Sequence, residues 1–260
     1  MICAGIDSGS RTIEIVLVDA DSLNVIAAVV ADQGVHQDAL TRRLYALLLD
    51  ENGLSADAVS RIVATGYGRN TITIADTTIT EITCHATGVR HLVPDAMTII
   101  DIGGQDSKII RMGGDGGVRD FAMNDRCAAG TGRFLEVVAA RLGVELQALD
   151  DLAARSTSPA AISSMCVVFA ETEIIGLLAA GAPPEDIVAG IQSAMASRVA
   201  GMVGRNVSPP VIFTGGVALL PGMDAALQRV LDVPVLVAPT PQLTGALGAA
   251  ILASRHLTDG

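Results

Sequence analysis

Two of the four cysteines stand where the chemistry of a thiol is favoured. Cys127 lies just before an apolar helix pattern, and Cys166 opens a second one. The first turn of a helix carries N–H groups without partners and a partial positive charge, and both stabilise a thiolate. The alternative for either residue is burial as a small apolar side chain, which is our interpretation of Cys3 and Cys84. A thiol that is not buried could instead bind a metal or take part in catalysis.

Two thiolates are too few for the sites that thiolates usually build. A tetrahedral zinc site and a four-iron cluster each take four ligands as a rule. A two-fold dimer would supply the missing pair, because each subunit would bring Cys127 and Cys166 to one cluster on the axis. The wide and irregular spacing of the cysteines argues against a disulfide framework.

Two aspartates with glycine turns form a second chemical pattern. Asp7 and Asp101 each end an apolar strand pattern, and the turns Ser-Gly-Ser and Ile-Gly-Gly follow them. Such a turn offers backbone N–H groups to phosphate oxygens, while the carboxylate can hold a hydrated Mg²⁺. One turn alone is equally a hairpin turn. The repeat, together with a third glycine pair at Gly215-Gly216, favours a nucleotide site.

The elements that position these residues alternate between strands and helices, and the order strand, Asp, glycine turn, strand occurs twice. We therefore expect an α/β protein with two lobes facing each other across a cleft. One lobe would comprise residues 1–92 and the C-terminal helix 243–260, the other residues 93–242. The expected strands cover 2–7, 13–19, 25–31 and 61–68, two strands around a glycine turn within 96–112, a strand from 209 that breaks at Gly215-Gly216, and 234–239. The expected helices cover 36–52, 81–92, 130–142, 164–180, 184–205 and 244–252, with one more between the strands at 209 and 234.

Composition excludes several classes of function. A net charge of -11 and 2% aromatic residues argue against nucleic acid as a partner. Every apolar run is too short to span a bilayer, and the N-terminus has no signal-peptide pattern, so we expect a cytoplasmic protein without a membrane partner. Lys108 is the only lysine and lies in no P-loop motif, which excludes a P-loop NTPase.

Taken together, the glycine motifs resemble those of the actin, sugar-kinase and heat-shock-chaperone superfamily, whose duplicated ribonuclease H-like lobes bind ATP in the cleft between them. The resemblance implies that the matching positions bind Mg-ATP or ADP. These positions are Asp7, Ser8, Gly9, Ser10 and Arg11 in the first phosphate motif, Asp101, Gly103 and Gly104 in the second, and Gly215, Gly216 and Val217 in the adenosine motif.

The resemblance also implies roles for residues beside these motifs. Glu81 would orient water near Mg²⁺, although a first-turn helix acid is the alternative. Gln105 and Asp106 could orient the attacking water, and ordinary turn polarity is their alternative. Gly245 and Gly248 would let the two connecting helices cross closely.

A closer resemblance covers nearly the whole chain. The stretches "ATGYGR", "EITCHA", "DIGGQDSK", "DRCAAGTGRFLE" and "AISSMCVVFAETE" are similar, in this order, to the activator component of 2-hydroxyacyl-CoA dehydratases. This family also includes ATP-binding subunits of benzoyl-CoA reductase.

The family resemblance implies an ATPase coupled to electron transfer. Its homodimer would hold one 4Fe-4S cluster through Cys127 and Cys166, with Gly130, Thr131 and Gly132 also at the cofactor site. Ferredoxin or flavodoxin would donate the electron, and an iron-sulfur dehydratase or reductase would receive it. Lobe closure on ATP would move the two cysteine helices and lower the cluster's potential.

The chain departs from the family pattern at one position. Glu14 stands where the family generally has a lysine. Strand alternation could turn Glu14 away from the nucleotide, or Arg11 could replace the missing charge.

Three other functions stay open. The partner could be a benzoyl-CoA-type or double-cubane cluster reductase instead of a dehydratase. A sugar kinase of the N-acetylglucosamine type would share the nucleotide motifs but need no paired cysteines. A filament-like or chaperone-like ATP switch would work without iron.

Overall fold

The computed structural model describes residues 1–163, 166–204 and 207–258. The first residues of the helix expected at 164–180, the end of the helix expected at 184–205 and the last two residues of the lobe expected to end at 260 lie outside this part. The chain divides into two compact units, each with one five-stranded sheet. The first contains residues 1–96, 112–119 and the C-terminal segment from Ala238; the second contains residues 97–111 and 120–237.

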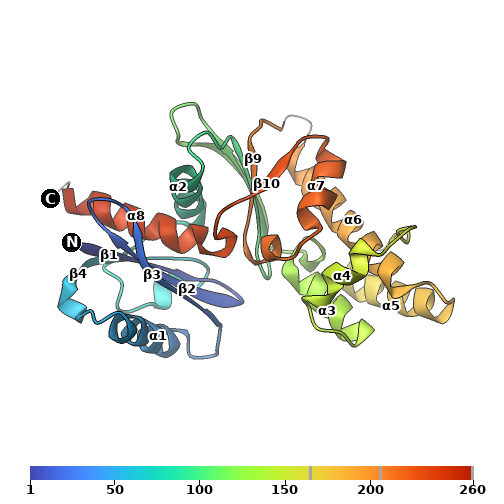
Figure 1. Ribbon diagram of the computed structural model, residues 1–260, viewed down its shortest axis with the longest axis horizontal. Coiled ribbons are helices and arrows are strands. Elements are labelled where there is room, and N and C mark those ends of the chain that lie inside the picture. The colour runs from blue at the N-terminus through green and yellow to red at the C-terminus, as the bar shows by residue number, and fades with distance from the viewer. Residues whose placement is uncertain (164–165, 205–206, 259–260) are drawn as a thin grey trace. The chain divides into compact units, whose positions relative to one another are not determined.

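The first sheet has the strand order β3-β2-β1-β4-β5 (Figure 1). Strands β1 and β2 are antiparallel, as are β2 and β3, whereas β4 runs parallel to β1 and β5 parallel to β4. The nearly continuous apolar runs of β1 and β2 are buried on both faces of the sheet. The strands are β1 (Ile2–Ser8), β2 (Thr12–Asp19), β3 (Val25–Asp32), β4 (Val59–Thr65) and β5 (Thr77–Thr78).

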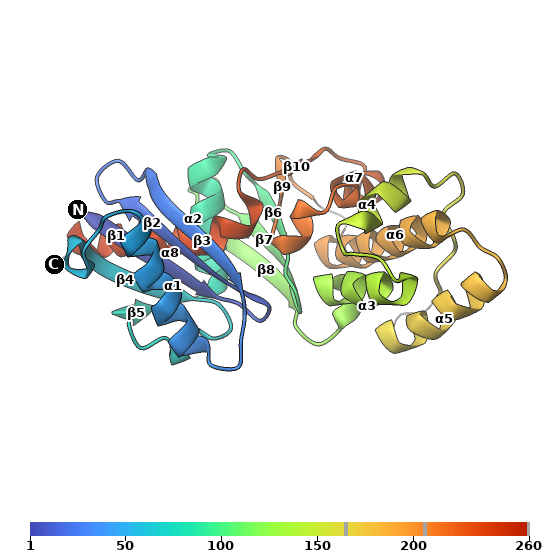
Figure 2. The same cartoon turned by 60° about the horizontal axis from the view of Figure 1, so that its bottom comes forward.

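Helices cover the two faces of this sheet (Figure 2). Helix α1 (Gln37–Glu51) packs on one face through Tyr45, Leu48 and Leu49. Helix α8 (Thr244–Thr258) packs on the other face and against α2 (Glu81–Leu92). A Cβ atom at Gly248 would lie 1.8 Å from the carbonyl oxygen of Cys84, so α2 and α8 cross as closely as the sequence predicts.

The second sheet repeats the first with the order β10-β9-β6-β7-β8. Strands β6 and β7 form the antiparallel pair that corresponds to β1 and β2, and β9 is parallel to β6 and to β10. Its strands are β6 (Thr98–Ile102), β7 (Ser107–Met112), β8 (Val118–Asn124), β9 (Val211–Thr214) and β10 (Val235–Val237). The two sheets confirm the α/β class and the duplication.

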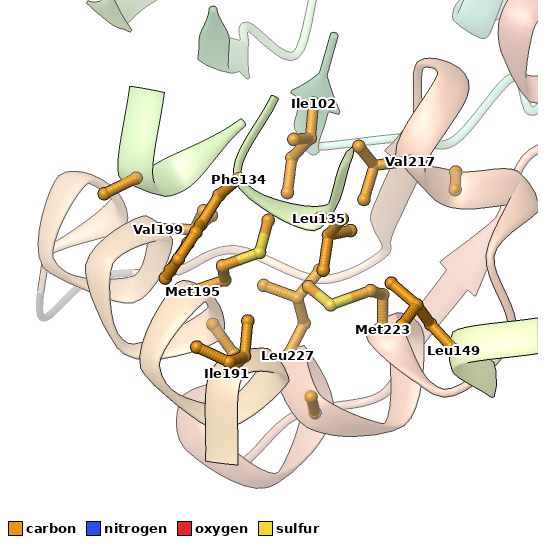
Figure 3. Packing of buried hydrophobic residues seen from close by; sticks show 14 of the residues in the cluster. Ile102, Phe134, Leu135, Leu149, Ile191, Met195, Val199, Val217, Met223 and Leu227 are labelled. Atoms are coloured by element: carbon orange, nitrogen blue, oxygen red, sulfur yellow. The ribbon is translucent and has the colours of Figure 1, made fainter. Parts of the chain in front are cut away.

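A large apolar cluster joins the helices of the second unit to its sheet. Figure 3 shows Phe134 and Leu135 of one helix against Met195 and Leu227 of two others. The helices are α3 (Gly132–Leu142), α4 (Ala148–Ala154), α5 (Val167–Ala179), α6 (Pro184–Val203) and α7 (Met223–Leu231). None of the helices among the described residues is long and apolar enough to cross a membrane.

Candidate functional site

The first aspartate turn places a buried carboxylate between two glycines. Asp7 lies near the end of β1 and is 8% exposed. A Cβ atom at Gly66 would lie 2.4 Å from Oδ1 of Asp7, and one at Gly245 would lie 2.0 Å from Oδ2. Gly66 also has φ +91°, in the left-handed region that favours glycine. Any side chain at either position would displace the carboxylate.

Backbone and side-chain hydrogen bonds hold the turn that follows Asp7. The N–H of Gly9 donates to the carbonyl oxygen of Thr12 at 3.0 Å. The side-chain amide of Gln33 donates to the carbonyl oxygen of Gly9 at 2.8 Å and to Oγ of Ser8 at 3.3 Å. Of the remaining predicted residues in this turn, Ser10 is half-buried and Arg11 is exposed.

Glu14 lies on the same face of the first sheet as Asp7. The two residues are direct partners across the β1–β2 ladder, and side chains of such partners project from one face. Strand alternation therefore does not separate Glu14 from Asp7, contrary to one of our two expectations. The carboxylate of Glu14 is buried and accepts a hydrogen bond from the side chain of Gln242 at 2.9 Å, while Arg11 lies 3.8 Å from Asp32.

Helix α2 adds titratable groups to the surroundings of Asp7. Glu81 is its first residue and lies 4.0 Å from the guanidinium of Arg69. Nε2 of His85, one turn later, lies 4.0 Å from Oδ2 of Asp7. Burial raises the pKa of the Cys84 thiol to about 12, and the charges of Asp7 and Glu81 raise it too. Cys84 is thus a protonated core residue, as is the equally buried Cys3.

The second aspartate turn has a different set of partners. Asp101 is 2% exposed; its Oδ1 accepts from the hydroxyl of Thr214 at 2.8 Å, and its Oδ2 lies 3.3 Å from Nζ of Lys108. The same ammonium lies 2.7 Å from Oδ2 of Asp106. Gln105 is exposed at the tip of the turn. One buried lysine therefore pairs with two carboxylates here.

Backbone hydrogen bonds tie the second turn to the start of α3. The N–H groups of Gly132 and Arg133 donate to the carbonyl oxygens of Gly103 and Gly104, both at 2.9 Å. A Cβ atom at Gly132 would lie 3.2 Å from the oxygen of Gly103 and 3.3 Å from Cγ2 of Val217. The second unit thus brings together four of the predicted site residues, namely Gly103, Gly104, Gly132 and Val217. The hydroxyl of Thr131 bonds to Ala128, next to Gly130, and Gly215 follows β9 with φ +88°.

Cys127 is exposed in a loop that Asn124 closes. The N–H of Cys127 donates to Oδ1 of Asn124 at 3.1 Å, and Nδ2 of Asn124 donates back to the carbonyl oxygen of Cys127 at 2.8 Å. A 3-10 turn, Ala128–Gly130, then leads into α3. One side chain thus fixes both peptide groups of the cysteine.

Cys166 is also exposed, and it is the N-cap residue just before α5. Oε1 of Glu173, on α5, accepts bonds from the N–H and the hydroxyl of Ser163, both at 2.9 Å. An ion pair between Arg141 and Glu171 connects α3 to α5. The two helices that follow the exposed cysteines are therefore joined directly to each other.

A pocket of about 630 Å³ lies beside these loops. It is lined by Asn124 and Cys127 from one loop and by Ile162 and Ser163 from the segment before Cys166. Arg198 and Met202 of α6 also line it. The Cys127 loop and residues 162–163 thus border one space.

The donor atoms of these sites suit two different cofactors. The carboxylate of Asp7 is the hard oxygen ligand that Mg²⁺ prefers. The exposed thiols of Cys127 and Cys166 are the ligand type of iron-sulfur clusters. Within the described residues, no group of three or more His, Cys, Asp or Glu side chains could hold a metal ion by itself.

Sequence reasoning missed the partners of these residues. His85, Thr214 and Asn124 were given no role, although His85 lies in the quoted stretch "EITCHA", and Lys108 was noted only as the single lysine. Gly66 was part of a quoted motif without a role. The spacing of seven residues from Asp7 to Glu14 and from Asp101 to Lys108 could have indicated that the last two occupy equivalent positions.

Known proteins match the chain over almost its full length. The activator of lactoyl-CoA dehydratase from Anaerotignum propionicum is 45% identical over 254 residues, which is 97% of each chain. The solved structure of the activator of 2-hydroxyisocaproyl-CoA dehydratase from Clostridium difficile, with bound ADPNP, has a TM-score of 0.94 and 40% identity and covers 100% of this chain and 96% of that one.

A second solved structure is equally similar. It is component A of the (R)-2-hydroxyglutaryl-CoA dehydratase of Acidaminococcus fermentans, with a TM-score of 0.94, 39% identity and coverage of 99% of both chains. These matches confirm the actin-like ATPase fold and the resemblance to dehydratase activators. The sequence model of the BadF/BadG/BcrA/BcrD ATPase family matches residues 4–253, and the chain belongs to this family.

Proposed function

We propose that the protein is an ATP-hydrolysing activator of a 2-hydroxyacyl-CoA dehydratase, and that it passes single electrons to this iron-sulfur partner. The observation that carries the proposal is the contrast between its cysteines. Cys127 and Cys166 are exposed at loops leading into two connected helices, whereas Cys3 and Cys84 are buried. A homodimer would place four exposed thiols, two from each chain, around one 4Fe-4S cluster.

The chain's own residues would bind and orient the nucleotide. Asp7 would hold the hydrated Mg²⁺, and the N–H groups of the two glycine turns would bind phosphate oxygens. Gln105 is the better placed of the two predicted water-orienting residues, because the carboxylate of Asp106 is paired with Lys108. Glu81 would orient water at the first turn.

Direct hydrogen bonds support a coupling between the second turn and Cys127. The carbonyl oxygens of Gly103 and Gly104 accept hydrogen bonds from the first two N–H groups of α3. A shift of this turn on nucleotide binding would therefore move the start of α3. Cys127 lies only five residues before Gly132, and Arg141–Glu171 would carry the movement to α5. The positively charged N-terminal ends of both helices would then move relative to the two thiols.

The proposed electron path is balanced without further reactants. Ferredoxin or flavodoxin in its reduced form would give up one electron, and the dehydratase would gain it, while ATP and water become ADP and phosphate. A bound 4Fe-4S cluster would supply the one-electron carrier. Helix N-termini near the thiols favour negative charge, so their movement would change the energy of the reduced state.

Iron analysis of the anaerobically purified protein tests this proposal. We expect about four irons and four sulfides per dimer, with an EPR signal after reduction. The variant Cys127→Ala, Cys166→Ala should lose iron while it keeps its circular dichroism and its ADP binding. The matched control, Cys3→Ala, should keep its iron because this thiol is buried.

Two results would contradict the proposal. One is a folded, ATP-hydrolysing wild type that binds no iron even after anaerobic reconstitution, which would favour the sugar kinase. The other is a midpoint potential that is the same with ADP and with a non-hydrolysable ATP analogue, even with the dehydratase present, which would remove the coupling.

A further inference from the structure

His85 is a buried histidine that lies between α8 and the first aspartate turn. It is 6% exposed and follows Glu81 by one helical turn on α2. Its two ring nitrogens contact different parts of the first unit. Nδ1 lies 3.1 Å from Oγ1 of Thr244, and Nε2 lies 4.0 Å from Oδ2 of Asp7.

The contacts of Thr244 fix the tautomer of the neutral ring. The hydroxyl of Thr244 donates its proton to the carbonyl oxygen of Pro241 at 3.3 Å. Its oxygen therefore accepts a hydrogen bond from Nδ1–H of His85. In this tautomer Nε2 is an acceptor, and it faces the carboxylate of Asp7, which is also an acceptor.

Two acceptors that face each other call for a donor that serves both. Hydrogen bonds of about 2.8 Å from the two protons of one water span about 4 to 4.5 Å between the acceptor atoms. The separation of 4.0 Å between Nε2 and Oδ2 matches this spacing. Mg²⁺ usually keeps several waters, and those waters are strong hydrogen-bond donors.

We propose that His85 is a positioning residue of the nucleotide site, and that its Nε2 accepts a hydrogen bond from a water ligand of the Mg²⁺ held at Asp7. The inference rests on the proposed ATP function. His85 would fix both the carboxylate and the hydrated ion, while Thr244 fixes His85. This gives α8 a direct connection to the metal.

Close packing keeps the ring in this position. A Cβ atom at Gly245 would lie 3.2 Å from Cε1 of His85 as well as 2.0 Å from Oδ2 of Asp7. The glycine therefore allows the ring and the carboxylate to lie side by side against α8. Both ring nitrogens thus have defined surroundings.

The side-chain amides of Asn and Gln separate the two contacts of His85. Asn can reproduce the donor at Nδ1 and so keeps the bond to Thr244, but it has no atom at the position of Nε2. Gln reaches that position but leaves Thr244 without its donor. A purely structural histidine should be replaced better by Asn, whereas a residue that acts on Mg²⁺ should be replaced better by Gln.

The test measures ADP binding by calorimetry as a function of Mg²⁺ concentration, in wild type, His85→Asn and His85→Gln. We expect His85→Asn to raise the Mg²⁺ concentration for half-maximal tightening of ADP binding about tenfold or more. The affinity for ADP without metal should change less than twofold. His85→Gln should recover part of the Mg²⁺ effect. The matched control is His91→Asn, because His91 is exposed on the same helix.

The possible failures are distinguishable. If His85→Asn needs no more Mg²⁺ than His91→Asn, the inference is wrong. It is also wrong if His85→Asn weakens metal-free ADP as much as Mg-ADP, because the role would then be structural. If wild type binds no ADP at all, the proposed function fails instead. Should His85→Asn not fold, His85→Ala takes its place in the same comparison with His91→Asn.

Discussion

The turns after Asp7 and Asp101 are two copies of one element, and they differ in the residue opposite the aspartate. Glu14 is the partner of Asp7 across the first hairpin, whereas Lys108 is the partner of Asp101 across the second. Both partners are buried. The first copy therefore has a second acid and His85 close to Asp7. In the second copy, a buried ammonium is paired with Asp101.

This difference indicates that the two copies do different work. A carboxylate paired with a buried ammonium is a poor ligand for a cation, because the lysine already satisfies its charge. We therefore expect Mg²⁺ at Asp7 rather than at Asp101. The second turn, with its bonds to α3, is better suited to pass a movement towards Cys127. Under the proposed function, duplication would let one hairpin hold the metal and the other serve the coupling.

Removal of the ammonium should have the largest effect. Lys108→Met leaves the carboxylates of Asp101 and Asp106 without their shared counter-charge, and breaking a buried pair costs about 3 to 5 kcal/mol. We expect a loss of this size in the free energy of unfolding, measured by urea denaturation. Arg133→Met is the control, since its exposed pair with Glu136 is worth about 0.5 kcal/mol. Equal losses of unfolding free energy in the two variants would show that Lys108 does not stabilise the second turn through its buried ion pairs.

The second largest effect should come from the glycine beside Asp7. Gly245→Ala would place a methyl group 2.0 Å from Oδ2, and displacement of the carboxylate should weaken Mg-ADP binding about tenfold or more. Calorimetry measures the affinity. Gly176→Ala in α5 is the control, because no atom lies within 4 Å of that Cβ and binding should not change. Normal Mg-ADP affinity in folded Gly245→Ala would argue against a metal at Asp7.

The sequence predicts most of the elements because their apolar periodicity is regular. It missed β8, an edge strand in which Arg119 and Asp120 interrupt the apolar residues, and the short helix α4. The edge strands β3 and β10 were predicted, because their apolar residues form a continuous run. The pattern therefore fails where polar residues interrupt an exposed strand, and not at every sheet edge.

The candidate site was predictable in its motifs but not in its contacts. The glycine motifs and the places of Cys127 and Cys166 before predicted helices follow from the local pattern, whereas the exposure of these two thiols does not. The hydrogen-bond partners of Asp101 and His85 do not follow from local spacing. Thr214 lies 113 residues from Asp101, and Thr244 lies 159 residues from His85. Such pairs form only when the sheet and its crossover helices are complete. The roles that we assigned to Glu81, Gln105 and Asp106 stay predictions.

The smallest effect should follow from neutralising the acid of the first hairpin. Glu14→Gln keeps an oxygen that can accept the bond from Gln242, and it removes one negative charge from the face that carries Asp7. Phosphates should then meet less repulsion, so we expect ADP without metal to bind up to about tenfold more tightly. Mg-ADP should gain less, because the ion already offsets part of the charge. Weaker binding of Mg-ADP alone would instead place Glu14 among the groups that hold the hydrated ion, and the first hairpin would then have two acids for its metal where the second has an acid and a lysine.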